Sequence, residues 1–117
     1  MRAILALLCL ALATGVQLPT GATLDPAAAA SPVGNFPLAI AVAPGGDRTA
    51  ILLNGWREQG LQILDRDGAV LQTLTQPAFI GLAFAPDGKS LWASGGNEDA
   101  LYRYRWNDGQ AELDRII

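Results

Sequence analysis

The chain has 117 residues, with 8 Lys and Arg against 11 Asp and Glu and with no His. This length suits one domain or part of one, and the acidic balance offers no basic surface for nucleic acid. Without His, the sequence excludes a Ser-His-Asp triad and an imidazole metal site.

The first residues predict an export signal. A positive charge at Arg2 precedes an apolar run at residues 3–13 (AILALLCLALA), and small residues follow at 20–22 (TGA). A bilayer span needs ~20 apolar residues, so this run has the length of a signal-peptide core instead. We therefore expect a helical signal peptide at residues 1–22 and a periplasmic or secreted protein with no membrane span after cleavage. A short buried helix is the alternative.

The next segment predicts a linker. Cleavage after Ala22 would remove Cys9, the single cysteine, so no disulfide can support the mature chain. Residues 23–35 (TLDPAAAASPVGN) are rich in Ala, Pro and small polar residues and show no apolar period. Such a composition is typical of a flexible linker near a chain terminus.

The rest of the chain contains an internal repeat. Residues 41–46 (AVAPGG) recur as residues 83–88 (AFAPDG), and residues 61–63 (LQI) align with residues 102–104 (YRY) after a one-residue deletion. A period of ~40–45 residues with several short strands in each repeat is typical of β-propeller blades. The repeat predicts one blade at residues 36–76 and a second at residues 77–117.

Each copy predicts four strands separated by turn residues. The first copy has them at residues 38–43, 49–54, 61–65 and 69–74, and the second at residues 80–85, 91–94, 100–106 and 110–116. Pro86-Asp87-Gly88 and the two Asp-Gly pairs, at 67–68 and 108–109, have the composition of tight hairpin turns.

The polarity of the strands changes along each copy. The first strands, LAIAVA and IGLAFA, are apolar on both faces and have small residues at alternate positions, which suits the crowded centre of a propeller. The third strand of the second copy alternates Tyr102 and Tyr104 with Arg103 and Arg105, as a half-exposed strand does. We therefore expect an all-β fold of two four-stranded antiparallel blades. Two blades do not close a ring, and repeat proteins need about three units for stability. We expect further blades of the same chain, of which this is the N-terminal part.

A family resemblance agrees with this interpretation. Residues 85–97 (APDGKSLWASGGN) resemble the blade signature of bacterial YVTN-type (WD40-like) β-propellers. Residues 36–39 (FPLA), 54–56 (NGW) and 95–99 (GGNED) resemble more closely the propeller that precedes an alkaline-phosphatase-like phosphoesterase domain in certain exported bacterial proteins. The resemblance implies a seven-bladed ring that serves as a recognition or scaffold module. No phosphoesterase metal ligand is present to be carried over.

The candidate site lies on loops that the predicted topology places at one rim: residues 55–60 (GWREQG), 76–79 (QPAF) and 96–99 (GNED). Trp56, Arg57 and Glu58 form one candidate ligand-binding group, in which Trp56 beside Arg57 suits stacking on a sugar or a peptide. The alternative is that Trp56 packs on the neighbouring blade.

The second candidate group consists of Asn97, Glu98 and Asp99, whose hard oxygens are ligands that Ca²⁺ prefers. The alternative here is a solvated loop. The two other tryptophans, Trp92 and Trp106, occupy strand positions and are expected in the core.

The sequence favours a non-catalytic module that binds or scaffolds a protein or a small molecule in the cell envelope, with no catalytic residue and no cofactor. The alternative is the start of an exported hydrolase, either a propeller fused to a phosphoesterase or a lactonase-like propeller with a metal in its channel. Whether the whole protein is an enzyme stays open.

Overall fold

The computed structural model describes residues 16–25 and 27–117. The chain divides into two compact units, Met1–Ala30 and Ser31–Ile117. In the described part of the first unit, Gln17 and Thr23 form an isolated β-bridge, and the Leu18 amide donates to the Ala22 carbonyl at 2.7 Å. The helix predicted for the signal peptide is not seen over residues 16–22, and residues 1–15 of that prediction lie outside the described residues.

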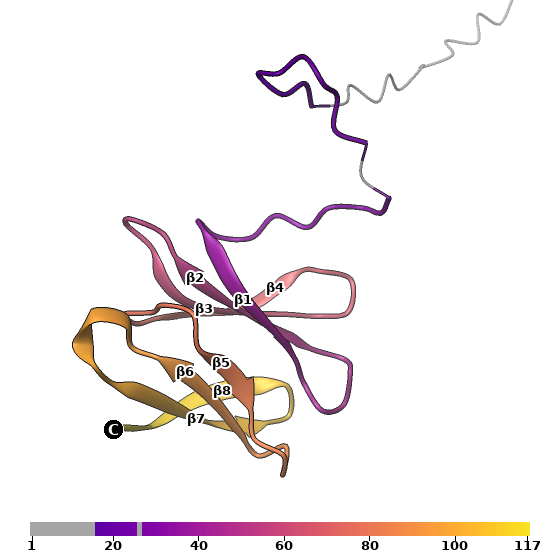
Figure 1. Cartoon of the computed structure of the whole chain (residues 1–117). Coiled ribbons are helices and arrows are strands. Elements are labelled where there is room, and N and C mark those ends of the chain that lie inside the picture. Colours follow the sequence, from indigo (N-terminus) through magenta and orange to yellow (C-terminus); the bar gives the residue numbers. More distant parts are fainter. Residues whose placement is uncertain (1–15, 26) are drawn as a thin grey trace, which may run out of the picture. The chain divides into compact units, whose positions relative to one another are not determined.

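The second unit is all-β and contains two four-stranded antiparallel sheets, as the sequence predicts (Figure 1). Sheet 1 consists of β1 (Pro37–Val42), β2 (Thr49–Asn54), β3 (Gln59–Leu64) and β4 (Val70–Thr75), paired in that order. Sheet 2 consists of β5 (Leu82–Phe84), β6 (Ser90–Ser94), β7 (Leu101–Asn107) and β8 (Gln110–Ile116), with a short 3-10 helix, η1 (Gly96–Glu98), between β6 and β7. The predicted bounds differ most at β3, which begins two residues before the predicted strand, and at β5, which is shorter than residues 80–85 at both ends.

The hairpin turns follow the predicted turn chemistry. Asp108 and Gly109 have φ angles of 49° and 74°, and two successive positive φ angles are what a type I′ turn requires. At the β5–β6 turn, Gly88 has a φ of 68° and its amide donates to the Ala85 carbonyl at 2.9 Å. Gly46 has the corresponding φ of 69° at the β1–β2 turn. These turns connect neighbouring strands directly, so each sheet keeps its strands in chain order.

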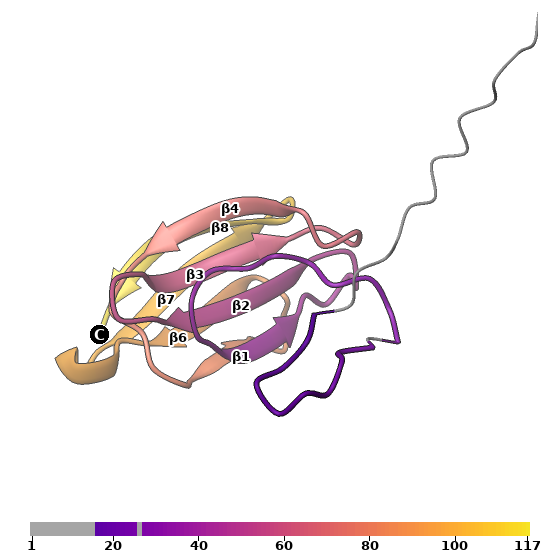
Figure 2. The same ribbon diagram turned by 90° about the horizontal axis from the view of Figure 1, so that it is seen from above.

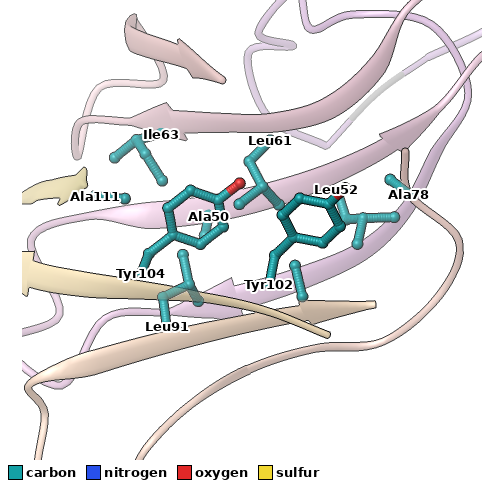
Figure 3. Packing of buried hydrophobic residues seen from close by; sticks show 10 residues of the cluster. Ala50, Leu52, Leu61, Ile63, Ala78, Leu91, Tyr102, Tyr104 and Ala111 are labelled. Carbon is teal, nitrogen blue, oxygen red and sulfur yellow. The ribbon is translucent and has the colours of Figure 1, made fainter. Parts of the chain in front are cut away.

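The main core lies between the two sheets (Figure 3). Leu52, Leu61 and Ile63 of sheet 1 and Leu91 of sheet 2 are less than 2% exposed. Burying a side chain of this size stabilises the fold by ~1.5–3 kcal/mol relative to leaving it exposed. The other buried members of the cluster are Ala50, Ala78, Ala93, Tyr102, Tyr104 and Ala111.

A smaller cluster lies on the outer face of sheet 1, which is the face turned away from sheet 2. There Val33 packs against three buried side chains, Ile51, Leu53 and Leu64. The Gly34 amide donates to the side-chain oxygen of Gln62 at 2.8 Å. Residues 31–34, hereafter the strap, therefore cover part of this face, although they fall within the segment predicted as a linker. The flexibility of the rest of that segment stays a prediction.

Strand pairing shows which residues of the two repeats are equivalent. Ala41 pairs with Ala50 in sheet 1, and Ala83, the repeat partner of Ala41, pairs with Trp92 in sheet 2. Ala50 and Trp92 are therefore equivalent. Ala50 lies in the core between the sheets, whereas Trp92 lies on the opposite face of its sheet, because its neighbour Leu91 points into that core.

Opposite faces of two equivalent sheets thus meet, so the two sheets stack head-to-tail. The sheets stack with their strands in the same order. β1 contacts β5, and β4 lies beside β8 (Figure 2). The β1–β2 and β5–β6 turns lie at the same end, because a Cβ added at Gly88 would be 3.3 Å from Cγ of Pro44. Sheet 2 is therefore a copy of sheet 1 moved along the stacking direction, not a copy turned to face it.

The third strands depart from the sequence alignment by one residue. Ala50 pairs with Ile63 and Trp92 pairs with Arg103, so Ile63 corresponds to Arg103 and not to Tyr104, as the alignment predicts. A shift of one residue turns every side chain of a strand to the other face. This shift is why the aliphatic residues of β3 and the tyrosines of β7 lie on opposite faces of equivalent sheets and meet in one core.

Candidate functional site

The structure brings the three predicted rim loops together. The Gln76 amide donates to the Gln59 carbonyl at 3.2 Å, and the Ala78 amide donates to the side-chain oxygen of Gln59, also at 3.2 Å. A Cβ added at Gly96 would lie 3.0 Å from the Ala78 carbonyl oxygen. The β2–β3 loop, the connection between the sheets and η1 are therefore neighbours at one end of the stack (Figure 1).

Trp56 and Arg57 line a hollow at this rim. The residues around it come from the β2–β3 loop and from the approach to β1, and they are Asn35, Phe36, Asn54, Gly55, Trp56, Arg57 and Gln59. The Gly55 amide donates to the Glu58 carbonyl at 3.0 Å, which closes the loop into a tight turn. Gly55 is buried, and a Cβ there would lie 2.6 Å from Cβ of Asn35. The hollow therefore rests on a closely packed backbone.

The exposed aromatic rings are the main feature of this hollow. Trp56 is 97% exposed and does not pack on sheet 2, while the alternative that it packs on a neighbouring blade beyond these two stays a prediction. Phe36, which is 64% exposed, lines the same hollow and was not identified from the sequence. The φ of Phe36 is 54°, a left-handed conformation that is uncommon for a bulky residue. Strained residues of this kind are concentrated at functional sites. A residue before proline favours extended backbone, so no sequence signal pointed to this conformation.

Arg57 and Glu58 are adjacent in sequence, but they border different depressions of the surface. Both side chains are exposed, and neither takes part in an ion pair among the residues that the structure describes. Arg57 lines the hollow of Trp56, whereas Glu58 borders a different depression beside β3 and β4. Of the first predicted group, the structure therefore places Trp56 and Arg57 at one site and Glu58 outside it.

The second predicted group, Asn97, Glu98 and Asp99, lies in and after η1. The Glu98 carboxylate accepts a hydrogen bond from the Tyr102 hydroxyl at 2.9 Å, and this bond is the main reason why the pKa of Tyr102 is raised, followed by burial and by the charge of Glu98. Asp99 has a φ of 51° and borders a hollow formed with Phe79 and neighbouring residues. The two predicted groups therefore do not share a hollow. Within residues 16–25 and 27–117, no cluster of His, Cys, Asp and Glu suits a metal ion.

The two remaining tryptophans have different surroundings. Trp106 is half-buried beside the core and packs edge-to-face on Phe84, with ring centroids 4.8 Å apart and planes at 80°. Trp92 is half-buried on the outer face of sheet 2, where the Arg103 guanidinium lies 5.6 Å from its ring centroid. The predicted core position is confirmed in part for Trp106 and is wrong for Trp92, because Trp92 points away from the core.

The outer face of sheet 2 is charged around Trp92. Arg103 pairs with Asp114 at 3.2 Å, and Arg105 pairs with Glu112 at 3.1 Å and with Asp114 at 3.7 Å. Exposed ion pairs of this kind contribute about 0–1 kcal/mol each, so they add little to stability. They do give this face a different character from the aliphatic outer face of sheet 1.

Comparison with known proteins adds no family. A scan against models of protein families finds no match, and a search of curated proteins finds no significant similarity. In the part of the chain that the structure describes, no helix is long and apolar enough to cross a membrane.

Proposed function

We propose that this chain supplies two adjacent blades of an exported β-propeller-type repeat module, which binds a ligand at the rim that carries Trp56. The head-to-tail contact of the two sheets is the observation that supports it most strongly. A contact between two different faces leaves one unused copy of each face at the ends of the stack, so such contacts generate rings or open stacks. A sandwich in which two like faces meet would instead leave two copies of the same face at its ends.

Three further observations support a propeller. The first strands of the two sheets, β1 and β5, contact each other at one edge of the stack. Small residues at alternate positions of these strands, such as Ala41 and Ala83, suit strands that converge on an axis. The resemblance of residues 85–97 to a YVTN-type blade implies the same architecture. Further blades of the same chain are the partners that this proposal requires.

The rim hollow supports binding of an oligosaccharide. Trp56 and Phe36 offer two exposed rings, on which the apolar face of a sugar stacks. The amides of Asn35, Asn54 and Gln59 and the Arg57 guanidinium supply donors and acceptors that match sugar hydroxyl groups. A few polar groups around an apolar surface are the usual composition of a ligand site.

Calorimetric titration of the purified chain with soluble cell-wall oligosaccharides tests the ligand. Trp56→Ala is expected to weaken binding roughly tenfold or more, because it removes the larger stacking surface. Trp92→Ala is the matched control, since Trp92 lies on the outer face of sheet 2, and it should leave affinity unchanged. Equal affinities for Trp56→Ala and the unaltered chain would exclude this site, and binding of peptides in place of sugars would change the ligand class.

Export is the second part of the proposal. In a bacterial host, the chain should reach the periplasm and start at Thr23, because residues 1–22 have the charge and apolar run of a signal peptide. N-terminal sequencing of the periplasmic fraction checks this. Leu7→Asp interrupts the apolar run and should keep the precursor in the cytoplasm. An uncleaved chain in the cytoplasm without that substitution would contradict export.

A further inference from the structure

The strap covers part of the outer face of sheet 1, and comparison of the two repeats indicates that this face is a sheet-binding surface. Ile40 and Val42 lie on the outer face of sheet 1 and are 68% and 62% exposed. Their repeat equivalents in sheet 2 are Leu82 and Phe84, and both of these pack against the core between the sheets. The outer face of sheet 1 is thus the counterpart of the face through which sheet 2 binds sheet 1.

The same equivalence holds for the second and third strands. Ile51 corresponds to Ala93, and Leu64 corresponds to Tyr104, because these residues occupy matching register positions. Ala93 and Tyr104 are core residues of the sheet–sheet contact. In sheet 1 the matching residues are instead buried under Val33 of the strap. The strap therefore occupies the position that another sheet would take.

The strap covers this face incompletely. Val33 is its only side chain in the apolar cluster, and the Gly34 amide makes its hydrogen bond to Gln62. A hollow remains between Val33 and β1, bordered by Pro37 and Ile40. A four-stranded sheet would bury Ile40 and Val42 as well, so it offers this face more apolar contact than the strap does.

We propose that the strap is a displaceable cover on a sheet-binding face, and that the partner of this face is another four-stranded sheet of the same repeat, supplied in solution by a second copy of this chain. This inference rests on the proposed repeat function. The second copy would present the outer face of its sheet 2, where Trp92 and Leu101 are the equivalents of Ala50 and Leu61. Two copies would then join head-to-tail, in continuity with the contact that already joins the two sheets.

Sedimentation velocity of the purified mature chain tests the cover. Val33→Asp places a charge against Ile51 and Leu64 and should release the strap. The variant is expected to shift from a single monomer boundary to sedimentation coefficients that rise with concentration. Ala30→Asp is the matched control, since it adds the same charge at an exposed residue just before the strap, and it should remain monomeric.

Two additional variants identify the surfaces. In the Val33→Asp background, Ile40→Asp should abolish association because it blocks the receiving face. Leu101→Asp should also abolish it, because that residue lies on the opposite, donating face of sheet 2. Association that survives Leu101→Asp would mean that two like faces meet, and it would overturn the head-to-tail partner. A folded Val33→Asp chain that stays monomeric at all concentrations would overturn the cover itself.

Circular dichroism establishes that each variant is folded. Should Val33→Asp unfold, Gln62→Ala replaces it, because it removes the acceptor of the strap's hydrogen bond without adding charge; association is again expected and its absence again overturns the proposal. Oligosaccharide titration separates the two proposals. The rim hollow contains no strap residue, so failure of the strap inference leaves Trp56-dependent binding intact, and loss of that binding leaves the sedimentation result unaffected.

Discussion

Tyr104 places a hydroxyl group in the middle of the apolar core. The side chain is 2% exposed, and its hydroxyl donates to the side-chain oxygen of Gln76, which is itself 5% exposed. The side-chain Nε2 of Gln76 has no hydrogen-bond partner within the described residues. An unsatisfied buried polar group costs ~1–3 kcal/mol, so the core depends on this pair being kept.

The pH dependence of stability follows from the same residue. Burial first, and the charge of Tyr102 second, raise the pKa of Tyr104 from 10.0 to about 12. The unfolded chain therefore loses this proton near pH 10, while the folded chain retains it. The contribution of the raised Tyr104 pKa to the free energy of unfolding is complete below pH 10 and is lost as the pH rises through about 12. Thermal midpoints should fall over this window, with phenolate absorbance recorded in parallel.

Tyr104→Phe is the control for that measurement. In this variant the thermal midpoint should decrease less as the pH rises. The remaining decrease is due to Tyr102, whose pKa is also raised. At neutral pH it should lower the free energy of unfolding by ~1–2 kcal/mol, because Gln76 loses its partner. An unchanged pH profile in this variant would show that Tyr104 does not titrate as expected.

At the scale of the elements, the hairpin turns connect sequence to fold most directly. Gly109 and Gly46 both have positive φ angles, 74° and 69°, so a side chain at either is strained. Their surroundings differ. A Cβ at Gly109 would lie 2.7 Å from Nε of Arg48, whereas a Cβ at Gly46 would meet nothing within 4 Å.

This difference separates two contributions to stability. Gly46→Ala should cost about 1 kcal/mol, which is the penalty for the left-handed backbone alone. Gly109→Ala should cost more, because Arg48 must also move. Urea denaturation of the two variants provides the comparison. Equal losses would show that Arg48 adapts freely and that the contact between the β7–β8 turn and the first sheet adds nothing to stability.

The strand periodicity predicted all eight strands, but it did not predict how the edges of the sheets meet. At one edge, the Gln72 side chain of β4 donates to the Ala111 carbonyl of β8 at 2.8 Å and accepts from the Ala111 amide at 3.0 Å. The side-chain amide of Gln72 thus pairs with the edge strand β8 as the backbone of a neighbouring strand would. Nothing in the local pattern around Gln72 marks it for this role, because its partner lies 39 residues away.

At the scale of the whole molecule, the two ends of the stack differ. The outer face of sheet 1 is aliphatic and carries the strap, whereas the outer face of sheet 2 carries Trp92 and the ion pairs of Arg103 and Arg105. A head-to-tail stack always has two different ends. In the proposed association, removal of the strap frees the first end, and the outer face of sheet 2 of a second copy binds there.

The sequence alone determined the local structure of the second unit: the repeat, the strands and the turns that connect them. These features depend on side-chain alternation and on φ angles available to Gly and Asp, and both are properties of neighbouring residues. The tertiary structure decided which faces meet, where Trp56 and Phe36 lie, and what the strap covers. A one-residue shift in β7 relative to β3 reverses the face that a strand presents, and only packing of the two sheets against each other selects between the two faces.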